Sequence, residues 1–263
     1  MRVLAPILAY HKVSNKYEWG ITSVRVRQFE SQVRYLAQQN YRTISLERYI
    51  NGNYESIPGR PLVIFTFDDA DESVYHHAFP ILKAHGFTAT LFVISDFVGK
   101  NSSWDANLGG ISSRHLDWQH IKALAQQGWE IGSHTATHPD LVRLSSDQVT
   151  IELCQSRETI SRQIQQPVRL LSYPFNRFDQ RVVALTRETG YAGACALSVS
   201  EQVRKQHGNF AIQRQGVYLI DSLYNFQQKL SNSRIERLKQ QIISFASRGT
   251  ILYNRLRKIK PQL

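Results

Sequence analysis

The chain has 263 residues, of which 42% are hydrophobic and 20% are charged. This composition supplies a large core and excludes a chain that is disordered throughout, because such chains bury too little apolar surface to offset the entropy of ordering. The net charge of +11 favours anionic partners, but neither a zinc-finger spacing nor an RNA-recognition signature accompanies it. From the length and composition we expect a single domain over residues 1–263. From the missing motifs we expect no nucleic-acid partner.

Strand-like runs alternate with amphipathic helical patterns along the chain. The strand-like runs cover residues 3–10, 61–67, 88–94, 129–133, 168–173, 191–197 and 211–220. The helical patterns cover residues 26–36, 73–84, 117–127, 147–165 and 179–189. Such alternation is typical of a parallel sheet, and seven strands fit a closed or nearly closed α/β barrel. The aperiodic segment 95–116 predicts a loop over the mouth of the barrel.

The two ends of the chain carry further signals. The apolar N-terminal stretch 1–11 resembles a strand more than a signal peptide, and no run is long enough to span a membrane. The chain as written is therefore expected to be cytoplasmic, or in the cell envelope or outside the cell if a leader has been removed. From about residue 233 we expect a basic helix, either simply solvated or docked on an anionic surface.

Cys154 and Cys195 lack a zinc-ligand pattern and predict buried thiols.

Two polar clusters directly follow predicted strands. Asp68 and Asp69 come after the run 63–67, and adjacent carboxylates repel each other unless something such as a cation separates their charges. The alternative is a polar turn that caps the next helix. His134 and His138 follow the run 129–133, and this spacing places both imidazoles on one side of a helical turn, where they can bind one ion. Taken alone, such a histidine pair also arises by chance.

The positions of these clusters strengthen the metal-site hypothesis. In a parallel barrel the carboxyl ends of the strands converge on the face where catalysis takes place. His11 and the segment 173–176 also follow predicted strands. Two histidines and one carboxylate leave coordination positions open for water and substrate, which is typical of a catalytic metal site. The sequence therefore predicts a metal-dependent hydrolase.

Three segments resemble the motifs of the polysaccharide deacetylases, the NodB-homology carbohydrate esterases. Residues 66–69 (Thr-Phe-Asp-Asp) resemble the first motif, residues 133–139 (Ser-His-Thr-Ala-Thr-His-Pro) the second, and residues 173–175 (Tyr-Pro-Phe) the third. The resemblance covers roughly residues 5–198. It implies a distorted (β/α) barrel of about seven strands.

The resemblance also implies roles for individual residues. Asp69, His134 and His138 would bind a divalent metal, usually zinc, and the same ligand set suits Co²⁺, Ni²⁺ or Fe²⁺. Asp68 would be the catalytic base, and the backbone amide of Phe175 would help to stabilise the oxyanion. The third motif often carries an arginine before its proline, but the preceding residues here are Leu-Ser-Tyr. The group that orients Asp68 is therefore not identified.

The catalytic acid also departs from the usual family pattern. We find no late Leu-x-His motif, and His207 lies in the polar stretch 205–209, which predicts a turn. The opening Tyr10-His11-Lys12-Val13 instead resembles the poly-β-1,6-N-acetylglucosamine deacetylases of biofilm matrix, in which an N-terminal histidine supplies the acid. His11 is thus the candidate acid. The alternative is that His11 is an ordinary loop histidine, or one that contacts the site residues without touching the substrate.

The expected reaction is removal of N-acetyl groups from an amino-sugar polysaccharide such as poly-N-acetylglucosamine, a chitin-like polymer or peptidoglycan. Trp104, Tyr173 and Asn176 are candidates for substrate binding. Two alternatives stay open: a small-amide or cyclic-imide hydrolase on the same barrel, and a glycan-binding relic without catalysis.

Overall fold

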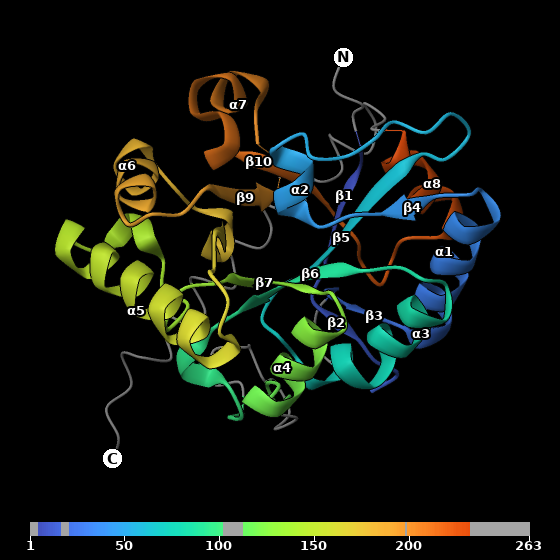
Figure 1. The fold of residues 1–263 in the computed structure, drawn as a ribbon, viewed down its shortest axis with the longest axis horizontal. Helices are drawn as coiled ribbons and strands as arrows, with labels where there is room; N and C mark the ends of the chain where they lie inside the picture. Colours follow the sequence, from blue (N-terminus) through green and yellow to red (C-terminus); the bar gives the residue numbers. More distant parts are fainter. Residues whose placement is uncertain (1–4, 17–20, 102–112, 198, 232–263) are drawn as a thin grey trace.

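A computed structural model describes residues 5–16, 21–101, 113–197 and 199–231. In these residues seven parallel strands form a closed ring (Figure 1). Their order around the ring is β1 (Ile7–Tyr10), β10 (Ile212–Gly216), β9 (Gly193–Leu197), β8 (Leu170–Ser172), β7 (Glu130–Ser133), β6 (Ala89–Val93) and β5 (Leu62–Phe67). Pairing of β5 with β1 closes the ring, with Leu8 opposite Phe65. Each strand-like run contains one of these strands, so the predicted barrel is confirmed.

Helices surround the ring at the positions that the periodicity predicts (Figure 1). They are α1 (Val26–Gln38), the π-helix η1 (Val74–Ala78) continuing into α3 (Phe79–Ala84), α4 (Trp118–Gln126), α5 (Ser146–Ile164) and α6 (Gln180–Glu188). Six further helices and strands were not predicted: β2 (Lys12–Val13), β3 (Ser23–Val24), β4 (Arg42–Thr43), α2 (Leu46–Ile50), α7 (Glu201–His207) and α8 (Leu223–Leu230). Short 3-10 turns complete the list: η2 (Ser95–Phe97), η3 (Leu141–Arg143), η4 (Pro174–Asn176) and η5 (Gly208–Phe210).

The hydrophobic core has two parts, which alternate along each strand. On β5, Val63 and Phe65 pack in the larger cluster with the surrounding helices, whereas Leu62 and Ile64 pack in a smaller cluster with Phe92. Side chains of a strand alternate between its faces, so the smaller cluster fills the interior of the ring. Both faces of the sheet are therefore buried, which explains why strands such as β5 and β6 are continuous apolar runs in the sequence. The same alternation turns Thr66 and then Asp68 toward the interior.

Some predictions about the loops and ends need correction. Residues 205–209 were expected to form a turn, but helix α7 (Glu201–His207) runs through the start of this stretch, because the Ser200 side chain caps it by accepting a bond from the Val203 amide. The last ring strand ends at Gly216 rather than near residue 220, since the Asp221 carboxylate accepts a bond from the Tyr218 amide and the chain turns there. Residues 102–112 of the expected mouth loop, and the expected C-terminal helix, lie outside the described residues.

Two further predictions about the chain concern its cysteines and membranes. Both cysteines carry free thiols; Cys195 is buried and Cys154 half-buried. In the described part of the chain, no helix combines the length and the apolar character needed to cross a membrane.

Candidate metal centre

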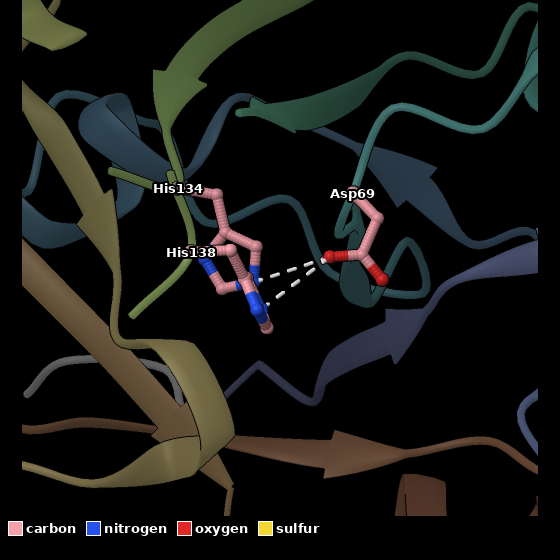
Figure 2. Close-up of side chains that lie close together, drawn as sticks. All are labelled: Asp69, His134 and His138. Carbon is pink, nitrogen blue, oxygen red and sulfur yellow. Dashed lines mark ion pairs between the residues drawn. The ribbon is translucent and has the colours of Figure 1, made fainter. Parts of the chain in front are cut away.

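Asp69, His134 and His138 come together at the carboxyl ends of β5 and β7. Figure 2 shows both imidazoles directed at the Asp69 carboxylate. The Asp69 Oδ1 atom lies 3.5 Å from His134 Nε2 and 3.7 Å from His138 Nε2. One ligand atom from each residue lies within 4.8 Å of the other two. Two imidazole nitrogens and one carboxylate oxygen at this spacing fit a single divalent metal with positions left open, so the residues present suit the ion that the sequence predicts.

Burial keeps both imidazoles in the form that binds metals. It lowers the pKa of His134 to about 4 and lowers the pKa of His138 well below its ordinary value, because the charged ring is disfavoured away from water. Both rings are therefore neutral at pH 7. His134 Nδ1 lies 2.6 Å from the carbonyl oxygen of Ser172, so Nδ1 carries the proton and Nε2 offers its lone pair toward Asp69.

The loop between the two histidines is irregular, and the predicted helical turn is wrong. Thr135 and His138 have left-handed backbone angles, with φ of 69° and 59°. The Thr135 hydroxyl accepts a bond from the His138 amide at 3.0 Å and helps to hold this shape. The imidazole centroids of His134 and His138 still approach to 4.7 Å, because the loop folds back on itself instead of coiling.

Asp68 lies beside this cluster and is bound by Arg214 of β10. The Arg214 guanidinium donates two parallel bonds of 2.7 Å, one to each Asp68 carboxylate oxygen, and also bonds the hydroxyls of Thr66 and Ser172. Arg214 is fully buried and Asp68 is only 4% exposed. Burial alone would raise the pKa of Asp68, but the charge and hydrogen bonds of Arg214, together with the nearby His134 and His11, outweigh it and hold this pKa well below its ordinary value. The carboxylate is therefore ionised and fixed in orientation.

Arg214 is the residue that reading the sequence missed. The family pattern places an arginine just before Pro174, in the third motif, whereas the structure supplies it from the last ring strand, 146 residues after Asp68. One signal was available. Arg214 is a lone charge in the strand segment Ile212–Gly216, and a charge on an interior position of a barrel requires a buried partner.

His11 follows β1 and belongs to the same group of side chains. It is half-buried. Its charge contributes to lowering the pKa of Asp68 and those of His134 and His138. The structure thus places the candidate acid near both the candidate base and the candidate metal ligands.

The third motif and Asn176, which follows it, border the metal cluster, but only Phe175 of these residues has its ring against a proposed metal ligand. The Phe175 ring centroid lies 4.6 Å from that of His138, and Phe175 has a left-handed backbone with φ of 55°. The Asn176 side chain accepts a bond from the Leu197 amide at 2.7 Å, so it connects this turn to β9. Tyr173 is 1% exposed and its ring stacks on Phe178, 4.6 Å away. Tyr173 therefore packs in the core and offers no open ring to a sugar; Trp104 lies outside the described residues.

Comparison with known proteins identifies the family. A sequence model described as polysaccharide deacetylase matches residues 55–194, and the chain belongs to this family. It is 29% identical over 212 residues to a putative polysaccharide deacetylase, YxkH, of Bacillus subtilis (strain 168), covering 80% of this chain and 70% of that protein. It is 25% identical over 176 residues to the poly-beta-1,6-N-acetyl-D-glucosamine N-deacetylase of Staphylococcus aureus (strain MSSA476). That match covers 64% of this chain and 59% of the staphylococcal protein, so the chain spans less than two thirds of its length.

Solved structures show the same fold. The deacetylase PplD of Streptococcus pyogenes, in complex with acetate, superposes with a TM-score of 0.74 at 23% identity and covers 88% of this chain and 99% of its own. A putative polysaccharide deacetylase from Bacillus anthracis has a TM-score of 0.70 at 25% identity, with 86% of this chain and 68% of that chain covered. The family resemblance and the barrel expected from the motifs are thereby confirmed.

Proposed function

We propose that this protein is a metal-dependent deacetylase that hydrolyses N-acetyl groups of an amino-sugar polysaccharide. One observation carries the proposal. An ionised carboxylate, Asp68, is fixed by Arg214 beside a three-ligand cluster that fits a divalent metal. Membership of the polysaccharide deacetylase family supports the reaction class.

Asp69, His134 and His138 would hold the metal, with Zn²⁺ favoured and Co²⁺, Ni²⁺ or Fe²⁺ as alternatives. When bound, a divalent metal supplies Lewis-acid activation of water and of the acetyl carbonyl. Asp68 accepts a proton from the attacking water as the new carbon–oxygen bond forms. The Phe175 backbone amide donates a hydrogen bond to the developing oxyanion.

His11 completes the reaction at the leaving group. An amide nitrogen leaves poorly unless it is protonated, so protonated His11 donates a proton to it as the carbon–nitrogen bond breaks. The products are acetate and a free amino sugar, and water supplies the oxygen that acetate gains. The low pKa of Asp68 and the position of His11 fit these opposite roles, because the first group is ionised and ready to accept a proton, while the second is an imidazole, a common proton donor in catalysis.

Among amino-sugar polymers, we propose β-1,6-linked N-acetylglucosamine as the preferred substrate. His11 at the end of the first strand supports this choice, and so does the name of the staphylococcal relative. Chitin-like polymers and peptidoglycan are the nearest alternatives. Acetylxylan is expected to be a poor substrate, because the proposed site is matched to an amine leaving group that needs an acid, not to an O-acetyl ester.

The experiment measures acetate released by the zinc-loaded protein from β-1,6-linked N-acetylglucosamine oligomers, chitin oligomers, peptidoglycan and acetylxylan. Asp68→Asn should lower turnover about 10²–10⁴-fold. Asp147→Asn, which changes an exposed aspartate at the start of α5, is the matched control and should leave turnover unchanged. Faster turnover on acetylxylan than on every N-acetyl glycan would overturn the proposal. Hydrolysis of a cyclic imide without acetate release from any glycan would favour the imide-hydrolase alternative.

A further inference from the structure

Helix α5 holds the loop that carries the two histidines through Glu152. The Glu152 Oε2 atom accepts hydrogen bonds from the backbone amides of Ala136 and Thr137, both at 2.9 Å. Its Oε1 atom accepts a bond of 2.6 Å from the Thr137 hydroxyl. All three donors lie between His134 and His138. One carboxylate thus fixes the middle of the loop whose two ends are the candidate metal ligands.

A second contact from the same face of α5 fixes the start of the loop. Ser156 lies one helical turn beyond Glu152 and therefore on the same side of the helix. Its hydroxyl is 2.8 Å from that of Ser133, and the Ser133 hydroxyl accepts a bond from the Thr135 amide at 3.1 Å. The helix therefore contacts the loop at two successive points.

The opposite side of the loop is bonded to the segment after β6. The Ser95 amide donates to the Thr135 carbonyl at 3.3 Å, and the Asp96 amide donates to the Ala136 carbonyl at 3.1 Å. The loop is thus bonded on both sides, by backbone on one and by side chains of α5 on the other.

The loop needs such support because its own backbone does not favour its shape. Left-handed conformations are unfavourable for residues with a Cβ, and the loop has two, Thr135 and His138. Hydrogen bonds from backbone amides to a carboxylate are stronger than neutral ones, since the acceptor is charged. Glu152 is therefore suited to hold the loop where both imidazole nitrogens face Asp69.

We infer that Glu152 is a positioning residue for the metal centre, acting through the loop rather than on the metal. Among the described residues the cluster of potential ligands contains Asp69, His134 and His138 and not Glu152. The inference rests on the proposed function only in taking those three residues as the metal ligands. It predicts that the loop geometry set by Glu152, and not its charge near the metal, determines the affinity for the ion.

The test compares Glu152→Ala with Glu158→Ala in the full chain. Glu158 is an exposed residue on the same helix, so its replacement matches the change in charge and helix propensity. The affinity for Zn²⁺ and Co²⁺ is measured by competition with a chromophoric chelator, and the unfolding temperature is measured without metal. Glu152→Ala should bind both ions about 10–100-fold more weakly, the usual effect of removing a group that orients a metal ligand. Glu158→Ala should bind them as the wild type does.

Two further variants keep the test decisive if Glu152→Ala does not fold. Glu152→Gln retains an oxygen for the two amides, so its metal affinity should fall less than that of Glu152→Ala. Thr137→Val removes only the hydroxyl bond and should weaken metal binding modestly, by a few-fold. Metal affinity equal to that of Glu158→Ala in the Glu152 variants, with only a lower unfolding temperature, would mean a purely structural role. A wild-type protein that binds no divalent metal would instead refute the proposed function, and the inference with it.

Discussion

Replacing Arg214 with methionine should leave a buried negative charge on Asp68 without its partner. Methionine keeps most of the length of the side chain while removing the guanidinium, which is fully buried and forms two 2.7 Å bonds with Asp68. Removing one member of a buried ion pair typically costs about 3–5 kcal/mol, because the remaining charge is uncompensated. We expect a loss of this size in the free energy of unfolding at pH 7.

The loss should depend on pH in a defined direction. In the wild-type protein the pKa of Asp68 is lowered, so its ionisation stabilises the fold above its ordinary pKa of 3.8, and this contribution disappears as the pH falls toward the lowered pKa. In Arg214→Met the dominant remaining effect is burial, which raises the pKa of Asp68. Protonation of Asp68 then relieves the penalty, so the deficit should be larger at pH 7 than at pH 5. The acidic limb of the activity profile should move to higher pH, because the base must be ionised.

Urea unfolding at both pH values measures the deficit, with the double variant Arg214→Met/Asp68→Asn as the control. The double variant contains no unpaired charge, so it should be more stable at pH 7 than Arg214→Met alone. An equal deficit at pH 7 and pH 5, with no recovery in the double variant, would refute the reasoning. Such a result would mean that Arg214 acts through packing, for example against Phe92, whose ring lies 5.3 Å from the guanidinium carbon.

Replacing any of the three proposed metal ligands with alanine should lower metal occupancy, and full occupancy by elemental analysis in all three variants would contradict the assignment. His11→Ala should keep its metal but lose about 10²–10⁴-fold in turnover on an N-acetyl glycan. The loss should be far smaller on an aryl acetate, whose leaving group needs no acid, whereas Asp68→Asn should slow both; equal losses for His11→Ala would make His11 a structural residue. Truncation after Ser247 should weaken binding to anionic vesicles if the basic tail docks there, most visibly at low salt; identical sedimentation would favour a solvated tail.

The barrel was predictable because its strands are buried on both faces. Ring strands such as β5 and β6 are therefore continuous apolar runs that stand out from their surroundings. The elements that were missed are short or depend on distant contacts. Helix α2, for example, has five residues, and its Leu46 and Glu47 amides donate to the Glu130 carboxylate at the start of β7. No local pattern in the sequence reports such a contact.

The site was predictable where it consists of contiguous motifs. The three proposed metal ligands were predicted to lie together because each follows a predicted strand, and the structure brings one ligand atom of each within 4.8 Å of the other two. The shape of the histidine loop was not predictable, because it depends on bonds from α5. Tyr173 shows another limit. An aromatic residue next to a motif suits either a sugar or the core, and only packing on Phe178 decides between them.

The arrangement of the ring separates the residues proposed for metal binding from those proposed for proton transfer. The segment matched by the family, residues 55–194, contains Asp68 and every proposed metal ligand. His11 and Arg214 lie outside it, on either side, after β1 and on β10. These two strands are neighbours, with Leu8 opposite Gln215, and β1 also pairs with β5, which leads into Asp68. Closure of the ring therefore brings the first and the last strand close to Asp68, the proposed base: β1 leads into the proposed acid, and β10 carries the counter-ion of Asp68.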